Sequence, residues 1–99
     1  MSETKTKTRD EVRTKEPPLY KTICINDDFT TMDFVVDVLM EIFGKEDTEA
    51  IEITMDVHRR GKGVAGVYVY EIAEAKVEQA HSRAREQGFP FRMTIEPEK

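Results

Sequence analysis

After Pro17-Pro18, the hydrophobic pattern of this 99-residue chain alternates between the period of a strand and the period of a helix. Residues Tyr20–Ile25, Val64–Tyr70 and Phe91–Ile95 carry β-branched, aromatic or alternating apolar side chains, which predicts strands. Two helical stretches lie between the first and second of these strands, and a third lies between the second and the last. The predicted order is therefore strand, helix, helix, strand, helix, strand.

The first predicted helix, Met32–Phe43, has apolar residues at positions i, i+3, i+4, i+7 and i+8: Val35, Val38, Leu39, Ile42 and Phe43. We expect Thr30 or Thr31 to cap its N-terminus, with Asp33 completing a variant of the capping box three residues after Thr30. Gly44 should end the helix.

The second helix opens on Glu46 and Asp47, where negative charge favours the helix dipole, and Gly61 closes it. Its inner face is predicted to carry Ile51, Met55 and His58. The third helix has an inner stripe of Ala73, Val77, Ala80 and Ala84, and Gly88 stops it. His81 is expected on the solvated side of that helix.

These elements predict an α+β fold. It is a βααβαβ sandwich in which three helices pack on one face of a small, mainly antiparallel three-stranded sheet. The length suits one domain. Residues 1–16 hold a single valine and no aromatic residue, so they cannot bury enough surface to offset their ordering entropy. We expect a disordered extension over residues 1–17 and a folded domain over residues 18–99.

Composition limits the function. The net charge is −5 and the pI is about 5.1, which argues against a general nucleic-acid binder. A single cysteine excludes an internal disulfide framework and suits a reducing compartment. Neither a secretory signal nor an apolar run of membrane-spanning length is visible. We expect an intracellular monomer without a membrane segment.

The most informative stretch is Asn26–Asp33, Asn-Asp-Asp-Phe-Thr-Thr-Met-Asp, between the first strand and the first helix. Acceptor groups beside apolar side chains suit a cation attached to a hydrophobic group. A free protein N-terminus with a bulky first residue is such a group, because its α-amino pKa is about 8 and it is mostly charged at neutral pH. The same residues are also ordinary turn and N-cap chemistry.

Enzyme chemistry has weaker support. No nucleophile elbow and no Gly-rich phosphate loop are present. Cys24 and His58 form a conceivable nucleophilic pair, although an isolated cysteine is usually a small buried hydrophobe. Asp27, Asp28 and His58 could hold a metal, but the close ligand spacing typical of zinc sites is missing. No cofactor or metal is expected.

Three motifs together resemble the ClpS family. They are Asn26-Asp27-Asp28-Phe29-Thr30-x-Met32-x-Phe34-Val35, Val57-His58-x-x-Gly61-Lys62, and Gly66-Val67-Tyr68-x-x-Glu71-x-Ala73-Glu74-x-Lys76-Val77. The likeness spans roughly residues 18–96. It implies an adaptor of the ATP-dependent Clp protease in the N-degron pathway. Such an adaptor binds proteins with a bulky hydrophobic first residue (Phe, Tyr, Trp and, as a further candidate, Leu) and delivers them to the unfoldase ClpA for degradation by ClpP.

The resemblance also implies residue roles. Asn26, Asp27 and His58 would hold the α-amino group, while Asp28, Thr30 and Met32 would form the rim, with Met32 as a gatekeeper against β-branched first side chains. The hydrophobic pocket would be lined by Cys24, Ile25, Val35, Thr54, Val57 and Phe91. Glu71 and Lys76 would dock on the N-terminal domain of the unfoldase, and the tail before Pro17 would engage it. The implied location is the bacterial cytoplasm or the plastid stroma.

The sequence departs from the family pattern at three positions. Thr54 stands where a large apolar residue such as Met is usual, Phe91 where Leu is familiar, and Thr31 in place of a common Pro. Thr54 predicts a roomier and locally more polar pocket that favours Phe, Tyr or Trp over Leu. Two other readings stay open: a non-degradative, ribosome- or protein-binding module of the same fold, and a small metal-assisted hydrolase.

Overall fold

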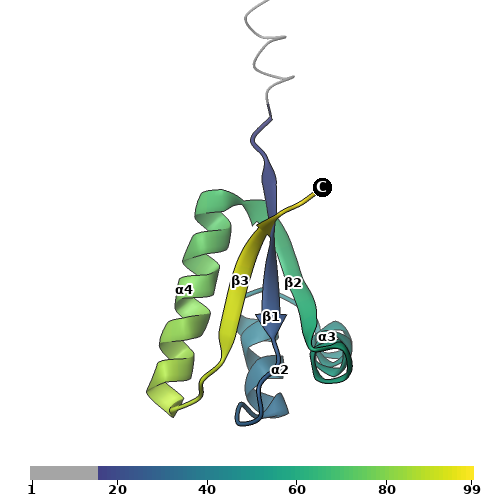
Figure 1. The fold of residues 1–99 in the computed structure, drawn as a ribbon, viewed down its shortest axis with the longest axis vertical. Helices are drawn as coiled ribbons and strands as arrows, with labels where there is room; N and C mark the ends of the chain where they lie inside the picture. Colours follow the sequence, from purple (N-terminus) through teal and green to yellow (C-terminus); the bar gives the residue numbers. More distant parts are fainter. Residues whose placement is uncertain (1–15) are drawn as a thin grey trace, which may run out of the picture.

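The computed structural model describes residues 16–99, so the disorder predicted for residues 1–15 lies outside the described residues. The elements are β1 (Leu19–Ile25), α2 (Met32–Glu41), α3 (Asp47–Arg60), β2 (Lys62–Val69), α4 (Tyr70–Gln87) and β3 (Arg92–Pro97). The strands form one antiparallel sheet in the order β2-β1-β3 (Figure 1). The predicted α+β architecture and its element order are confirmed.

The first strand is the centre of the sheet because both later strands pair with it. At its carboxyl end, Ile25 lies opposite Lys62 of β2 and Arg92 of β3. The register with β2 shifts between Thr22 and Ile23, which leaves Ala65 as an extra residue without a pairing partner. Such a bulge increases the local twist of the strand. The chain then leaves β1 into the loop that contains the Asn-Asp-Asp sequence.

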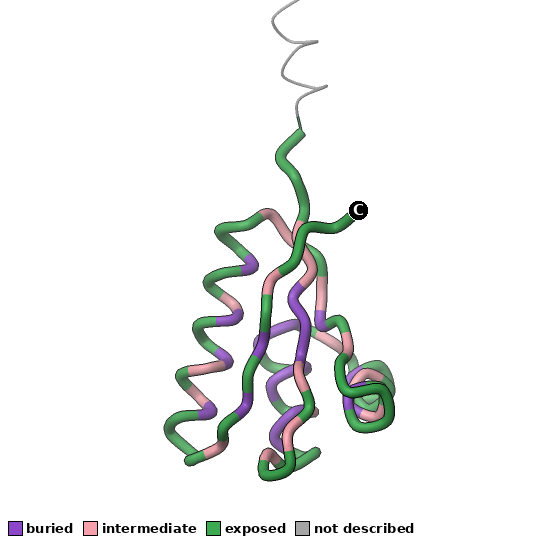
Figure 2. The backbone as a smooth tube through the Cα atoms, viewed as in Figure 1, coloured by how far each residue is buried: buried purple, intermediate pink, exposed green. Residues whose placement is uncertain are grey.

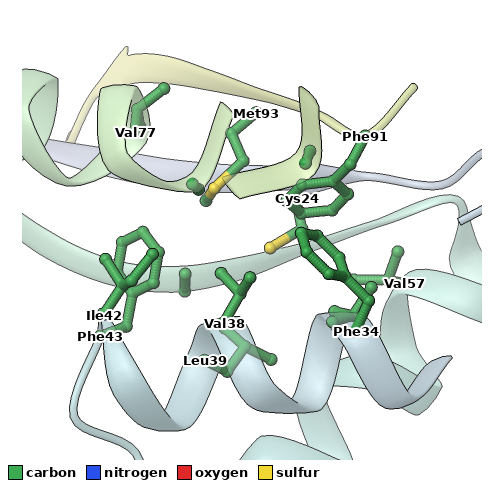
Figure 3. Close-up of a cluster of buried hydrophobic side chains, with 14 of the residues drawn as sticks. Cys24, Phe34, Val38, Leu39, Ile42, Phe43, Val57, Val77, Phe91 and Met93 are labelled. Carbon is green, nitrogen blue, oxygen red and sulfur yellow. The ribbon is translucent and has the colours of Figure 1, made fainter. Parts of the chain in front are cut away.

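The hydrophobic core lies between the sheet and the helices. Buried residues concentrate in the middle of β1 and on the side of α4 that faces the sheet (Figure 2). Val38 and Leu39 of α2 are fully buried, as is Cys24 of β1. Figure 3 shows Cys24 at one end of this core together with Phe34, Val57 and Phe91. The rings of Phe34 and Phe91 meet edge to face, with centroids 5.7 Å apart.

The first helix begins at Met32 with one of its two predicted caps, but it ends earlier than predicted. Thr31, rather than Thr30, is the N-cap, and its hydroxyl accepts a hydrogen bond from Phe34 N–H at 3.1 Å. The helix ends at Glu41, two residues before the predicted Phe43, because the chain turns through Gly44 with a φ of +68°. Ile42 and Phe43 remain buried beyond the helix end. Periodicity identified them as core residues, but it could not locate the turn.

The predicted inner face of α3 is wrong by one residue. Ala50, Thr54 and Val57 are the buried residues of this helix, whereas Ile51 is 46% exposed and His58 is also exposed. Both sets have the spacing i, i+4, i+7. The alternative set was harder to recognise because alanine and threonine are small or weakly hydrophobic. The correction places His58 at the solvent edge of the helix.

The expectation that His81 is solvated is also wrong. His81 is half-buried, and its Nε2 accepts a hydrogen bond from Met93 N–H of β3 at 2.9 Å. Burial lowers the pKa of His81, and the positive charges of Arg85 and Arg92 lower it further, against the opposing effect of Glu78. The histidine therefore fastens α4 to β3 in its neutral form.

We expect the free energy of unfolding to depend on pH through His81. Because its folded-state pKa is depressed, the stabilisation is complete above the ordinary value of about 6.5 and is lost as the pH falls through the folded-state pKa. The loss should be about 0.5–1.5 kcal/mol, the value of one hydrogen bond. Urea unfolding at pH 7.5 and 5.0 measures it, and His81→Gln should flatten the dependence. A variant that keeps the full pH dependence would place the effect in another group.

Candidate functional site

A cavity of about 270 Å³ opens between the loop that follows β1 and the helix α3. Its wall combines hydrogen-bonding and apolar side chains: Asn26, Asp27, Asp28, Thr30, Met32, Val35, Thr54, Val57 and His58. All nine are among the site residues named from the sequence. The structure therefore brings the Asn-Asp-Asp loop, the start of α2 and the second half of α3 to one place.

The loop wall is organised by the carboxylate of Asp27. Its Oδ1 accepts hydrogen bonds from Phe29 N–H at 2.8 Å and from Thr30 N–H at 2.7 Å. The Thr30 hydroxyl donates to Oδ2 at 2.7 Å. This is the turn chemistry that short Asp side chains favour. Both carboxylate oxygens thus already accept hydrogen bonds within the loop. The main contribution of Asp27 to the cavity is therefore its negative charge.

The charge on Asp27 is secure at neutral pH. Partial burial acts to raise the pKa of this carboxyl, but the hydrogen bonds from the Thr30 hydroxyl, Thr30 N–H and Phe29 N–H outweigh it, and the net pKa is lowered. Hydrogen bonds to a carboxylate favour its ionised form. The cavity consequently keeps a fixed anion on its loop side.

The opposite wall comes from α3. Val57 and Thr54 are buried with 3% and 4% exposure, one turn apart, and His58 stands at the exposed edge. The Thr54 hydroxyl donates to the carbonyl oxygen of Ala50 at 2.8 Å, within its own helix. That hydroxyl therefore spends its one donor on a partner inside α3, so it brings no unsatisfied donor to the cavity.

The two walls are tied together by backbone. Asn26 N–H donates to the carbonyl oxygen of Gly61 at 2.9 Å, which links the loop to the residue that ends α3. Gly61 has a φ of +92°, a conformation that favours glycine. The sequence predicted Gly61 as a helix stop, and the residue also belongs to the second of the three ClpS motifs. Its carbonyl contact across the site is a tertiary feature for which the sequence has no separate signal.

Three predicted pocket residues lie outside the cavity lining. Cys24 and Phe91 are core residues, 0% and 4% exposed, and they belong to the same cluster as Val35 and Val57. Figure 3 shows Cys24 and Phe91 on the side of the core where Val57 lies. Ile25 is half-buried in β1. Burial raises the pKa of the Cys24 thiol to about 12, so at neutral pH it is not a thiolate nucleophile. Cys24 and Phe91 thus support the pocket wall from behind.

The described part of the chain also answers two further questions from the sequence. Among residues 16–99, no three His, Cys, Asp or Glu side chains are grouped so that they could hold a metal ion. Within the same residues, no helix has the length and apolarity that crossing a membrane requires.

Comparison with known proteins decides the family. The family model described as "ATP-dependent Clp protease adaptor protein ClpS" matches residues 15–94. The chain belongs to the ClpS family. It is similar to the ATP-dependent Clp protease adapter protein ClpS of Wolinella succinogenes, with 46% identity over 96% of this chain and 93% of the relative. It is also similar to that of Acetivibrio thermocellus, with 50% identity over 85% of each chain.

A solved structure has the same fold. The structure of Agrobacterium tumefaciens ClpS2 bound to L-phenylalaninamide superposes with a TM-score of 0.81 and 38% sequence identity, over 84% of this chain and all of that chain. The ClpS relatives are named as adapters of the Clp protease, and this non-catalytic family gives the present chain an adaptor role rather than an enzymatic one.

The two residues that the ClpS resemblance assigned to unfoldase docking have different surroundings. Glu71 is exposed in the first turn of α4. Lys76 is half-buried, and its Nζ donates to the carbonyl oxygen of Ile42 at 2.9 Å. The same ammonium lies 5.3 Å from the ring centroid of Tyr68 and 6.0 Å from that of Phe43. Lys76 thus joins α4 to the end of α2 and satisfies a carbonyl group there.

We expect Lys76→Met to lower the free energy of unfolding by about 1–2 kcal/mol, because it removes a charge-assisted hydrogen bond and a cation–π contact. Glu71→Gln, at an exposed position on the same helix, should change it by less than about 0.5 kcal/mol. Urea denaturation of the two variants tests this difference. Equal stabilities would show that the Lys76 contacts contribute nothing measurable.

Proposed function

We propose that this ClpS-family chain binds the free N-terminus of proteins whose first residue is bulky and hydrophobic, and delivers them to a ClpA-type unfoldase. The observation that carries the proposal is the composition of the 270 Å³ cavity, where oxygen and nitrogen acceptors lie beside an apolar wall. A protonated first residue presents the same combination. Its ammonium group is cationic, and the adjoining side chain is hydrophobic.

The polar side of the cavity suits an ammonium group. An ammonium leaving water must regain its hydrogen bonds, or its burial costs several kcal/mol. The amide oxygen of Asn26 and an imidazole nitrogen of His58 are the acceptors for its three N–H donors, with the carboxylate of Asp27 acting through its charge or through water. Asp28 and Thr30 complete the polar rim.

The apolar side suits one large side chain. Met32, Val35, Thr54 and Val57 line it. Burying a Phe or Leu side chain there contributes about 1.5–3 kcal/mol. Met32 lines the cavity from the start of α2 and is 41% exposed, and we assign it the role of gatekeeper against β-branched first residues. Phe, Tyr and Trp are the expected first residues, with Leu as a weaker one.

A relative supports this assignment. The Agrobacterium tumefaciens ClpS2 structure is described as bound to L-phenylalaninamide. That ligand has a free amino group, an aromatic side chain and no carboxylate, so it has the chemistry of a first residue within a peptide. The 38% identity of the two chains makes the same ligand class the natural candidate here.

Delivery uses other parts of the chain. We assign docking on the N-terminal domain of the unfoldase to the exposed Glu71 of α4, with Lys76 contributing through the shape of that region. The extension over residues 1–17 is the segment that engages the unfoldase, while residues 18–99 form the adaptor domain. The proposed working state is a monomer in the bacterial cytoplasm, or in the plastid stroma.

The test titrates the chain with peptides that differ only in residue one, followed by fluorescence polarisation of a C-terminal dye. Phe, Tyr and Trp should bind best, Leu less well, and Val, Ala and Asp at least about 10-fold more weakly than Phe. Equal affinity for Phe and Asp would contradict the proposal. In a degradation assay with a ClpA-type unfoldase and ClpP, deletion of residues 1–16 should slow proteolysis while peptide affinity stays within about twofold.

A further inference from the structure

The strand β2 passes α3 at Gly63, where the two elements come unusually close. A β-carbon at this position would lie 3.0 Å from Val57 Cγ2, 3.3 Å from the carbonyl oxygen of Ile53 and 3.5 Å from Ile53 Cγ2. Optimal contacts between carbon atoms are about 3.5–4.0 Å. The helix therefore sits a few tenths of an ångström nearer to the strand than a residue with a side chain would allow.

Backbone conformation does not explain the glycine. The glycines with positive φ are Gly44, Gly61 and Gly88, and Gly63 is not among them. It pairs with Cys24 in regular antiparallel register. What Gly63 supplies is the absence of a side chain at the contact with α3.

The atoms facing Gly63 cannot move independently of the helix. The Ile53 oxygen is a backbone atom of α3. Val57 is 3% exposed, and a β-branched side chain in a helix has one strongly preferred rotamer. A methyl group added at position 63 would therefore displace the helix rather than a single side chain.

Val57 also lines the candidate site, as do Thr54 and His58 from the same helix. A displacement of α3 away from β2 would therefore move three side chains that line the cavity. We propose that Gly63 is a positioning residue that fixes the width of the first-side-chain pocket by allowing the close approach of α3. This inference rests on the proposed function of the site, and it deepens that function by naming what sets the selectivity.

Close approach of α3 offsets the short side chain of Thr54. Under this proposal it keeps the side chains of Thr54 and Val57 close to a small first residue such as Leu, which would otherwise leave part of the pocket unfilled. An unfilled gap of 0.5–1 Å forfeits about a quarter to a half of the dispersion energy of the atoms that line it. A wider pocket thus penalises Leu more than the larger Phe.

The experiment compares Gly63→Ala with the unmodified chain, using two peptides that differ only in Leu or Phe at residue one. The ratio Kd(Leu)/Kd(Phe) should rise by about 3- to 10-fold. Gly66→Ala is the matched control on the same strand, because the three atoms nearest to its added methyl would all belong to the Tyr68 side chain rather than to α3. That variant should leave the ratio within about twofold.

Val57→Ala tests whether the effect travels through α3. Adding Gly63→Ala to Val57→Ala should change the ratio less than it does in the unmodified chain, because the 3.0 Å contact is gone. An unchanged ratio in Gly63→Ala, or an equal change in both backgrounds, overturns the inference. If Gly63→Ala alone does not fold, recovery of folding by Val57→Ala supports the same contact, and failure to recover counts against it.

The outcomes also separate this inference from the proposed function. If the unmodified chain binds neither peptide, or binds N-acetylated forms equally well, the proposed function fails, and the proposed role of Gly63 fails with it. If it binds both free peptides and Gly63→Ala leaves their ratio unaltered, only the role of Gly63 fails.

Discussion

A peptide that begins with a free Phe should lose at least about 100-fold in affinity for this chain when its α-amino group is acetylated. Acetylation removes the positive charge and two of the three donors, and it adds bulk at the polar end of the cavity. Asn26 and His58 would lose their shared partner, and the charge of Asp27 would have nothing to stabilise. Hydrogen bonds to charged groups contribute about 1.5–3 kcal/mol each, so the combined loss is large.

Fluorescence polarisation with the two forms of one peptide measures this loss. A third peptide with a free Gly before the Phe restores the ammonium but moves the aromatic ring by one residue, and it should also bind weakly. This control separates recognition of charge alone from recognition of charge and side chain together. Comparable affinity of the free and acetylated peptides would mean that the cavity does not read the α-amino group.

The element order of the fold could be read from the sequence because each element has a strong local signal. The periods of β1 and α2 differ clearly, Gly61 and Gly88 cap their helices with positive φ, and Gly44 turns the chain with positive φ soon after α2 ends. The predictions that were wrong depend on tertiary contacts. The inner face of α3 was misassigned because two sets of residues have equal helical spacing, and only packing against β2 and α2 chooses between them.

The same limit applies to His81. Its neighbours on α4 gave no reason to expect burial, and its partner is the backbone of Met93, which is distant in sequence and adjacent only in the fold. Lys76 is similar, since the carbonyl that it satisfies belongs to Ile42 at the end of another helix. Contacts between a side chain and a remote backbone group have no periodic signature.

The candidate site was more predictable than these contacts because most of its wall comes from two short segments. Four of the nine lining residues come from the loop after β1, and three come from the second half of α3. The other two, Met32 and Val35, belong to the first turn of α2. Cys24 and Phe91, which the ClpS resemblance assigned to the pocket, are buried in the core and are not among the residues that line the cavity. From the sequence, turn formation and ligand binding were alternative roles for Asp27. In the structure the same carboxylate accepts the hydrogen bonds of the turn and also gives the cavity a negative charge, so the two roles are compatible.

That double role gives Asp27 the largest expected effect of any single substitution in the site. Asp27→Asn keeps an oxygen that can accept from Phe29 N–H and Thr30 N–H, but it removes the charge. At about 5 Å and an effective dielectric constant of 20, the lost attraction for an ammonium is about 3 kcal/mol, which solvent screening at this partly exposed position reduces to about 1–1.5 kcal/mol. Affinity for a free Phe peptide should fall about 10-fold.

Asp27→Ala should cost more, because the turn that holds the loop wall loses all three hydrogen bonds together with the charge. We expect affinity to fall about 100-fold and the free energy of unfolding to fall by about 1–2 kcal/mol. Asp33→Asn, which removes an equal charge from the first turn of α2 outside the cavity lining, is the control and should stay within about twofold. Raised salt should weaken peptide binding by the unmodified chain more than binding by Asp27→Asn, because only the unmodified chain has the Asp27 carboxylate charge for salt to screen.

The pH dependence of stability provides a second and independent measure of Asp27. Its folded-state pKa is lowered, so its stabilisation is complete above the ordinary value of about 3.9 and is lost as the pH falls through the folded-state pKa. Thr30→Val removes the hydroxyl that donates to Oδ2 and should raise that folded-state pKa toward the ordinary value, so the total acid-induced loss of stability should be smaller and should be complete at a higher pH. In acid unfolding experiments, the unmodified chain and Thr30→Val should therefore lose part of their free energy of unfolding below about pH 4 through protonation of Asp27. Asp27→Asn should show no such loss. If Asp27→Asn binds the free peptide as tightly as the unmodified chain while its acid profile changes as described, the carboxylate organises the turn without attracting the ammonium, and Asn26 and His58 must supply the recognition.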